Sequence, residues 1–321
     1  MVRYHLKTAK AIGVQAFLVD WYGPESYENQ QIPLLLKEAR KFGMKIALCY
    51  EEKINYEKFR DLKDPQAIEA KIIEDLTYIV THYGHDPAYL KRLGLPFIFQ
   101  FNHWDEGKAL RNTSPEQWKK IFAKVPGPLV YARQNFDRHY HPLMQGAYLW
   151  WTPDTDVLKE FPSEAEEARK NGKLQFYMSM ICPGFDDTGV WGWGSGPRKT
   201  ERYGLSVLRD TFDRAFKFHP ELIQIVTWND FEEGTAIEPS WEHGFWYLDA
   251  IETWWGKMTG RKIDLDDIRR PYQEYLKECS EFEWSMLPAP WMVKRSLMVE
   301  RPNVLESARK QAEAQSALTN Q

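Results

Sequence analysis

The residues best suited to chemistry in this sequence lie together in residues 227–239. This stretch and the residues just after it hold four carboxylates, one asparagine and two tryptophans: Asp230, Glu232, Glu233, Glu238, Asn229, Trp228 and Trp241. Hydrolysis of a glycosidic bond needs paired carboxyl groups that donate and accept protons, and flat aromatic faces on which a sugar ring stacks. Acidic residues after a strand often form only a solvated loop. Here the density of tryptophan and the Gly-Thr pair after Glu233 favour a site for a sugar.

Apolar runs that alternate with helical patterns must position these residues. The runs predict seven strands, near residues 14–19, 45–49, 96–101, 128–132, 147–150, 174–180 and 222–228. Strands that alternate with helices are typical of a parallel sheet covered by helices. Polar and aromatic residues follow most of these strands, as in a (β/α)8 barrel, which builds its active site from the loops after its strands.

The predicted fold class is therefore α/β, a (β/α)8 TIM-type barrel. An open doubly wound sheet is the alternative, but the sequence lacks the Gly-rich phosphate-binding turn that such a sheet carries after its first strand. Seven strands are one too few for a complete barrel, and residues 2–11 follow a helical pattern. We expect the first strand to lie upstream of Met1; a C-terminal segment that fills the gap and a strand missed in the count are the alternatives.

Three regions follow from the composition along the chain. We expect the barrel to span residues 1–260 and a C-terminal extension, with a helix near residues 264–279, to pack on it over residues 261–303. Residues 304–321 are polar and rich in Ala and Gln, which predicts a frayed or disordered tail.

The candidate ligands of a sugar are the acidic, amide and aromatic side chains at the strand ends. Besides Trp228, Asn229, Glu238 and Trp241, they are Asp20, Trp21, Tyr22, Tyr50, Glu51, Glu52, Asn102, Trp191 and Trp193. Asp20 has a helix-cap or turn role as its alternative. Trp191 and Trp193 lie in a Gly-rich loop that could equally fold on its own aromatics. Glu238 could bind the ligand or anchor the loop.

Composition excludes several classes of function. The net charge of −4 and a pI near 6.1 disfavour a nucleic-acid-binding protein. No apolar run is long enough for a membrane span. Aromatic residues make up 15% of the chain and include 14 tryptophans, which is typical of proteins that bind carbohydrate.

No cofactor or metal is expected. The three cysteines, Cys49, Cys182 and Cys279, give neither a metal motif nor a disulfide framework, and the first two are predicted to be small core residues. The pair His139 and His141 lacks a third ligand. We expect a monomer. The first residues contain no apolar signal region, so the compartment is not indicated, and a secreted or periplasmic origin stays open if residues precede Met1.

Residues 226–239 resemble the catalytic strand-eight loop of glycoside hydrolase family 99, the endo-α-mannosidases and their bacterial relatives. They also resemble WbsX-like proteins and, more loosely, family 71 α-1,3-glucanases. Residues 11–23, 86–99 and 182–188 resemble other segments of family 99 in the same order. The resemblance covers residues 11–249 and implies a (β/α)8 barrel whose usual opening segment precedes them.

The resemblance also implies roles for individual residues. The acid/base glutamate of the family falls on Glu233. Its second catalytic glutamate, which deprotonates the 2-hydroxyl of the substrate to give an anhydro sugar, falls on Asp230. Aspartate places its carboxylate about 1 Å short of that position, and the Asn-Asp pair resembles the inverting family 71. The third-strand acid of the family, a ligand of sugar hydroxyls, falls on Glu51 or Glu52.

We therefore expect a glycoside hydrolase that cleaves internal α-linkages of a mannan or a related α-glycan, with a polysaccharide as its partner. One alternative is a WbsX-type polysaccharide-biosynthesis protein, often described as a glycosyltransferase. The absence of a diphosphate-binding motif and of a basic cluster disfavours it. A second alternative is a carbohydrate-binding barrel without activity, which the Asp230 departure allows.

Overall fold

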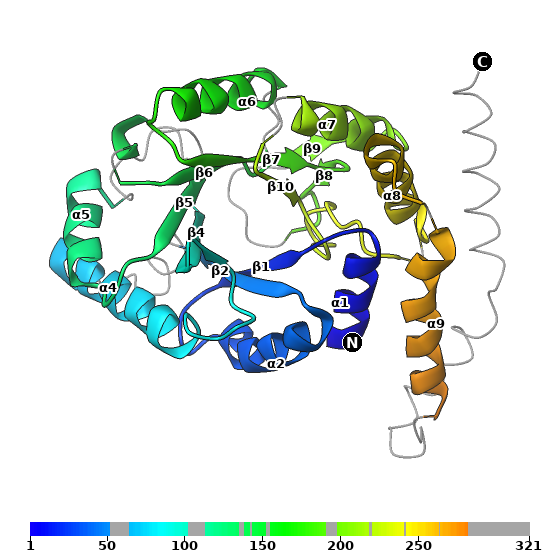
Figure 1. The fold of residues 1–321 in the computed structure, drawn as a ribbon, viewed down its shortest axis with the longest axis horizontal. Coiled ribbons are helices and arrows are strands. Elements are labelled where there is room, and N and C mark those ends of the chain that lie inside the picture. Colours follow the sequence, from blue (N-terminus) through cyan, green and yellow to red (C-terminus); the bar gives the residue numbers. More distant parts are fainter. Residues whose placement is uncertain are drawn as a thin grey trace. The chain divides into compact units, whose positions relative to one another are not determined.

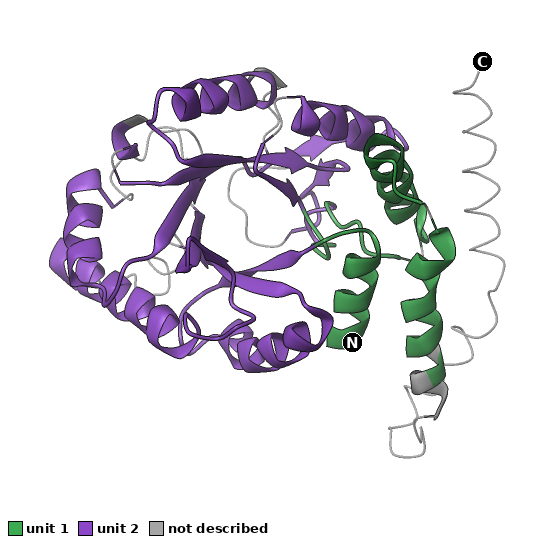
Figure 2. Cartoon of the chain, viewed as in Figure 1, with its two compact units in different colours: residues 1–14, 227–231, 235–321 green, residues 15–226, 232–234 purple. Residues whose placement is uncertain are grey.

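The computed structural model describes residues 1–51, 64–101, 113–134, 138–141, 143–151, 155–190, 198–217, 220–240, 242–262 and 264–281. Five predicted site residues lie outside these ranges: Glu52, Asn102, Trp191, Trp193 and Trp241. The chain divides into two compact units (Figure 2). Unit 1 contains residues 1–14, 227–231 and 235–321, and unit 2 contains residues 15–226 and 232–234. The domain boundaries expected at residues 260 and 303 stay predictions.

Unit 2 is built on a parallel sheet of seven strands, which confirms the predicted number. In spatial and chain order they are β1 (Ala16–Trp21), β2 (Lys45–Glu51), β4 (Leu95–Phe101), β5 (Val130–Gln134), β6 (Gly146–Tyr148), β7 (Phe176–Ile181) and β10 (Leu222–Ile225). The short β3 (Lys91–Arg92) pairs antiparallel with β4, and β8 (Phe185–Asp186) pairs with β9 (Lys199–Thr200). Within the described residues, no ladder joins β10 to β1.

Helices cover the outer side of this curled sheet (Figure 1). They are α2 (Tyr27–Phe42), α4 (Pro65–His82), α5 (Pro115–Lys124), α6 (Thr155–Lys170) and α7 (Ser206–Phe216). The arrangement is the predicted partial (β/α)8 fold. The last strand ends at Ile225 and not at Trp228, because the amide of Thr227 donates to the carbonyl of Thr235 and the chain turns there.

Local sequence explains where the helices begin and end. The Ser26 hydroxyl accepts from the Asn29 amide at the start of α2, and Gly43 ends that helix in the left-handed conformation, at φ 65°. Ser114 and Gln117 form a capping box at the start of α5. Pro65 occupies the first turn of α4, where its missing amide proton costs no hydrogen bond. These caps fix the ends of the helices and therefore the lengths of the loops that connect the helices to the strands.

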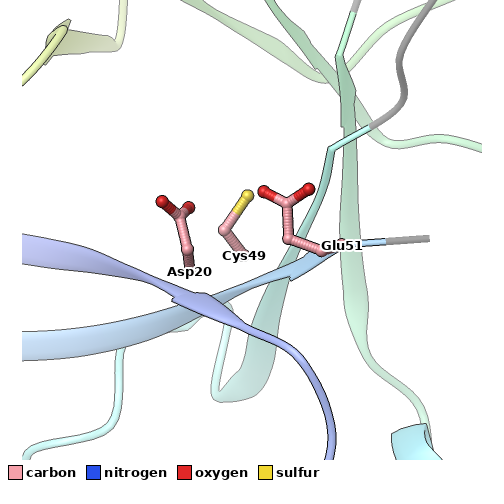
Figure 3. A group of neighbouring side chains, drawn as sticks. All are labelled: Asp20, Cys49 and Glu51. Atoms are coloured by element: carbon pink, nitrogen blue, oxygen red, sulfur yellow. The ribbon is translucent and has the colours of Figure 1, made fainter. Parts of the chain in front are cut away.

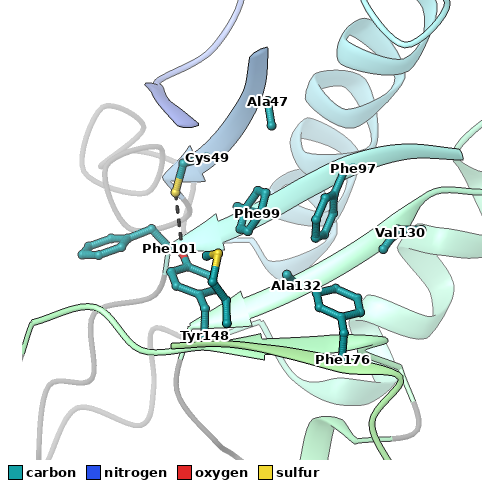
Figure 4. Close-up of a cluster of buried hydrophobic side chains, with 10 residues drawn as sticks. Ala47, Cys49, Phe97, Phe99, Phe101, Val130, Ala132, Tyr148 and Phe176 are labelled. Carbon is teal, nitrogen blue, oxygen red and sulfur yellow. Dashed lines mark hydrogen bonds between the residues drawn. The ribbon is translucent and has the colours of Figure 1, made fainter. Parts of the chain in front are cut away.

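The core of unit 2 fills the inside of the curled sheet (Figure 4). Side chains alternate along a strand, so every second residue of each strand points inward. The buried cluster consists of Ala47, Cys49, Phe97, Phe99, Phe101, Val130, Ala132, Tyr148, Phe176 and Met178. Cys49 is therefore a core residue, as predicted, and it lies at the end of the core nearest the carboxyl ends of the strands.

Gly146 packs closely against this core. A Cβ atom on it would lie 2.1 Å from the ring of Phe176, which is fully buried. We expect Gly146→Ala to lower the free energy of unfolding by about 1–3 kcal/mol, because the ring must leave its position in a packed interior. Urea unfolding measures this. Gly189→Ala is the matched control, since a Cβ atom there meets nothing within 4 Å. Equal stability of the two variants would contradict the prediction.

Unit 1 is a set of helices. Its described elements are α1 (Val2–Ala11), α8 (Trp246–Thr259) and α9 (Leu265–Glu281), with the segment around Thr227–Phe231. Tyr4 of α1 stacks on Tyr275 of α9 with ring centroids 5.3 Å apart. Arg269 of α9 makes two contacts with the Asp249 carboxylate of α8, at 2.6 and 3.0 Å. The predicted helix near residues 264–279 is thus present as α9. No described helix is long and apolar enough to cross a membrane.

Candidate active site

Three side chains of the acidic site come from the ends of β1 and β2. The parallel register pairs Asp20 with Cys49, and Glu51 follows Cys49 two residues later on the same face. Figure 3 shows the three side chains on one side of the two strands. One carboxylate oxygen of Asp20, one of Glu51 and the sulfur of Cys49 all lie within 4.8 Å of one another. Cys49 and Glu51 are each 5% exposed, whereas Asp20 is exposed.

Glu51 lies in an unusual electrostatic environment. Burial raises the pKa of its carboxyl well above the ordinary value, and the charges of Asp20 and Glu233 raise it further. Among the described residues, no hydrogen bond stabilises the ionised form. The charges of Asp20 and of the predicted acid/base residue Glu233 therefore disfavour ionisation of Glu51. The sequence placed either Glu51 or Glu52 here, and Glu51 is the one that the structure describes.

Tyr22 and Tyr148 extend this group. Burial raises the pKa of the Tyr22 hydroxyl, and the charges of Asp20, Glu51, Glu28 and Cys49 add to it. The Tyr148 hydroxyl donates to the Gln100 carbonyl at 2.9 Å and lies 3.6 Å from the Cys49 sulfur. The sequence had indicated Tyr22 but missed Tyr148. An aromatic residue at the end of β6 was the signal for it.

The short segment that carries Glu233 is held by its backbone. The carbonyl of Glu233 accepts from the Asp186 amide at 2.8 Å, and the carbonyl of Gly234 accepts from the Arg202 guanidinium at 2.8 Å. Gly234 has φ 61°, and a Cβ atom on it would lie 3.2–3.3 Å from Asp186. This explains the glycine after Glu233. It also gives a role to residues 182–188, whose β8 strand supports this turn.

Trp21 and Tyr50 do not face the acidic group. Both are completely buried on the helix side of the sheet. The Trp21 indole donates to Asn29 of α2 at 2.9 Å, and the Tyr50 hydroxyl donates to Asp75 of α4 at 3.1 Å. Alternation along a strand turns them away from Asp20, Cys49 and Glu51. They stabilise the packing of two helices on the sheet and do not line the face that carries the acidic group.

The remaining predicted residues lie on the loop of unit 1. Asn229 is exposed, and Asp230 is half-buried. The Asp230 amide donates to the Thr227 hydroxyl at 3.0 Å, and the Asp230 carbonyl accepts from the amides of Thr235 and Ala236 at 3.2 and 3.1 Å. These bonds close the loop into a turn. These hydrogen bonds therefore fix the backbone of Asp230.

Glu238 and Trp228 anchor this loop to helix α1 through His5. The Nδ1 atom of His5 lies 2.7 Å from a Glu238 carboxylate oxygen and 3.2 Å from the Trp228 indole nitrogen. The Trp228 indole N–H donates to Nδ1 when Nδ1 carries no proton, and Nδ1 donates to Glu238 when it carries one, so Nδ1 makes one of these two hydrogen bonds at a time. Glu238 is 7% exposed. Of the two roles that the sequence left open, its contacts favour the anchor.

The His5–Glu238 contact leads to a prediction. We expect His5→Ala to lower the free energy of unfolding of the protein by about 1–3 kcal/mol, because it leaves a buried carboxylate without its donor. The double variant with Glu238→Gln should recover part of the loss, and thermal unfolding of the four proteins measures this coupling. Strictly additive effects would show that the contact contributes nothing.

Comparison with known proteins identifies the family. The model of glycosyl hydrolase family 99 matches residues 1–250. The chain belongs to glycosyl hydrolase family 99. This confirms the resemblance that residues 226–239 carry.

Two curated relatives of this family 99 chain are named glycoprotein endo-alpha-1,2-mannosidase. The mouse protein (Mus musculus) is 21% identical over 265 residues, which is 74% of this chain and 53% of that protein. The rat protein (Rattus norvegicus) is 22% identical over 272 residues, with the same coverage of 74% and 53%. The chain therefore spans about half the length of the curated relatives it matches.

Solved structures show the same fold. The family 99 endo-alpha-mannosidase from Bacteroides thetaiotaomicron has a TM-score of 0.62 at 21% identity, over 85% of this chain and 80% of that one. A glycoside hydrolase-like protein has a TM-score of 0.58 at 16% identity, over 78% of this chain and 84% of that one. In this family 99 chain, the acidic residues of the predicted site that the structure describes are divided between the two units. Asp20, Glu51 and Glu233 belong to unit 2, and Asp230 and Glu238 belong to unit 1.

Proposed function

We propose that this chain is an endo-acting glycoside hydrolase that cleaves internal α-linkages of a mannan or a related α-glycan. Membership of family 99 and the likeness to relatives named endo-alpha-1,2-mannosidase support it. The observation that carries it is the shared environment of Glu51, Asp20 and Glu233. Acid–base catalysis at a sugar needs carboxyl groups whose protonation is set by burial and by neighbouring charge, and burial together with the charges of Asp20 and Glu233 raises the pKa of Glu51.

In the proposed reaction, Glu233 gives its proton to the glycosidic oxygen while the bond from that oxygen to C1 breaks. Asp230 takes the proton of the sugar's 2-hydroxyl, and O2 closes on C1 to form a 1,2-anhydro sugar. Water then attacks C1 and opens this ring. Glu233 takes a proton from the water, and Asp230 returns its proton to O2. Two displacements at C1 retain the anomeric configuration.

The other residues of the site bind the sugar in this proposal. Asp20 is exposed at a strand end and can accept hydrogen bonds from hydroxyl groups. Glu51 is buried, and the raised pKa of its carboxyl favours the protonated form, which can also donate to a sugar oxygen. Asn229 is exposed on the loop next to Asp230 and can offer an amide to a sugar hydroxyl.

Whether the reaction retains or inverts the anomeric configuration depends on what the Asp230 carboxylate can reach. Its carboxylate reaches about 1 Å less far than that of the glutamate that the family resemblance implies, and a near-attack geometry is sensitive to such a distance. The turn between Thr227 and Thr235 fixes the Asp230 backbone, so the side chain alone must make up the difference. Activation of a water by Asp230, with inversion, is the alternative use of the same carboxylate.

The test is the release of products from α-mannans of different linkage and from α-1,3-glucans. We expect oligosaccharides of several lengths, because an endo-acting enzyme cuts within the chain. Proton NMR during the first turnovers identifies the anomer, and an α-anomer supports the anhydro-sugar route. A β-anomer would assign Asp230 as the base for water. A folded sample that releases nothing contradicts hydrolysis, and a glycan-binding assay then separates a binding barrel from a protein that needs an activated donor.

A further inference from the structure

The thiol of Cys49 has no part in the proposed reaction, although it lies between two carboxylates of the site. We propose that Asp20, Cys49 and Glu51 form a binding site for one thiophilic divalent cation, of the class of Zn²⁺ or Cd²⁺. The bound cation then keeps sugar hydroxyls away from Asp20 and Glu51. This second statement rests on the proposed function, whereas the cation site itself does not.

The positions of the three donor atoms fit such an ion. All three lie within 4.8 Å of one another, on adjacent strands with a fixed register (Figure 3). Zinc binds thiolate sulfur at about 2.3 Å and carboxylate oxygen at about 2.1 Å, so the donors of a tetrahedral site lie about 3.5 Å apart. Side-chain rotations that move one carboxylate oxygen of Asp20 and one of Glu51 by about 1 Å bring the three donors to this spacing. One donor atom from each residue is enough. A water or a further group takes the fourth position.

The surroundings of Glu51 point independently to a ligand. This carboxylate is 5% exposed, and among the described residues it receives no hydrogen bond and faces no cation. A buried carboxylate without a partner is costly. Its neighbours, Asp20 and Glu233, make the potential at this position more negative. A divalent cation would supply a partner that the described residues do not provide, and it would offset the repulsion between the carboxylates.

The mixed donor set selects the class of ion. Ca²⁺ takes six to eight oxygen ligands, and Mg²⁺ usually keeps several waters and avoids sulfur. Thiolate sulfur with two carboxylates favours borderline or soft ions instead. Burial, Asp20 and Glu51 raise the pKa of the Cys49 thiol, so it is protonated in the absence of an ion. Binding must therefore form a sulfur–metal bond and release the thiol proton to solvent.

The experiment is a titration of the full chain with Cd²⁺, followed by the ultraviolet charge-transfer band of a cadmium–thiolate bond. We expect the wild type to gain the band with one Cd²⁺ per chain, and Cys49→Ser to lose it. Cys182→Ser is the matched control and should keep the band, because the Cys182 sulfur is buried elsewhere and donates to the Gly184 carbonyl. Glu51→Gln should weaken Cd²⁺ binding at least about 10-fold.

Calorimetry with Zn²⁺ in two buffers of different ionisation enthalpy provides a second readout, with at least one proton released per ion at pH 7. Absence of the band in the folded wild type, or an unchanged band in Cys49→Ser, would overturn the proposal. If Cys49→Ser does not fold, equal Cd²⁺ affinity of wild type and Glu51→Gln overturns it instead. A band in a protein that hydrolyses no glycan leaves the cation site standing and rejects the proposed function. Hydrolysis without a band supports the proposed function and rejects the cation site.

Discussion

Glu233→Gln is expected to lower kcat by about 10²–10⁴-fold on the glycan that the wild type cleaves best, because the variant cannot protonate the glycosidic oxygen. Glutamine keeps the size of the side chain and the Glu233 carbonyl that accepts from Asp186. The turn should therefore keep its shape, and KM should change less than kcat. Steady-state kinetics of the two proteins give both constants.

Glu232→Gln is the matched control for this prediction. Glu232 is adjacent in sequence, carries the same charge and is exposed, so its loss should leave kcat close to the wild-type value. An aryl glycoside with a good leaving group adds a second control, since its oxygen departs with little protonation. Glu233→Gln should release the aryl group in the first turnover at a rate close to that of the wild type, because only the second step then lacks its base. Equal losses in both variants, or full activity of Glu233→Gln on the glycan, would reject Glu233 as the acid.

The second large effect is expected for Glu51→Gln, which should lower kcat/KM by about 10–100-fold, the size of a lost hydrogen bond between a substrate and a charged or strongly polar group. The same variant should be more stable than the wild type at neutral pH. Glutamine fills the same space, and it removes an ionisable group that is buried next to Asp20 and Glu233.

The direction of the pH dependence follows from the raised pKa of the Glu51 carboxyl. The folded protein holds this proton at pH values where the unfolded chain has released it, so folding becomes less favourable as the pH rises above the ordinary value of 4.5. The penalty grows until the pH passes the raised pKa of the folded state, and then stays constant. Glu51→Gln lacks it. Urea unfolding of the wild type and the variant from pH 4 to pH 8 should show a difference that increases with pH. A constant difference would contradict it.

The sequence predicted the sheet well because its strands are continuous apolar runs. All seven runs became strands of one parallel sheet, with ends within a few residues of those expected. Local sequence is a poorer guide to α6, which begins at Thr155 and contains Pro162. A proline usually marks a boundary, and here the helix passes through it.

The candidate site was harder to predict because its contacts join distant parts of the chain. His5 meets Glu238, and Cys49 lies beside Asp20, and no local pattern indicates either pair. The sequence indicated Trp21 and Tyr50 as sugar ligands because they are aromatic and lie at strand ends. Alternation puts them on the opposite face from Asp20 and Glu51, and this could have been inferred once the strand bounds were fixed.

Cys49 and Tyr148 belong to the packed core and also lie beside Glu51. This limits which substitutions the protein can accept during evolution. A substitution at either position alters the packing of the phenylalanines around it and the polarity next to the carboxylates in one step. Most such changes would be removed by selection for stability before any gain toward a new glycan could be used. Asp20 is exposed and belongs to no such cluster. Divergence of specificity in this lineage is therefore expected to begin at Asp20, while Cys49 and Tyr148 stay constant.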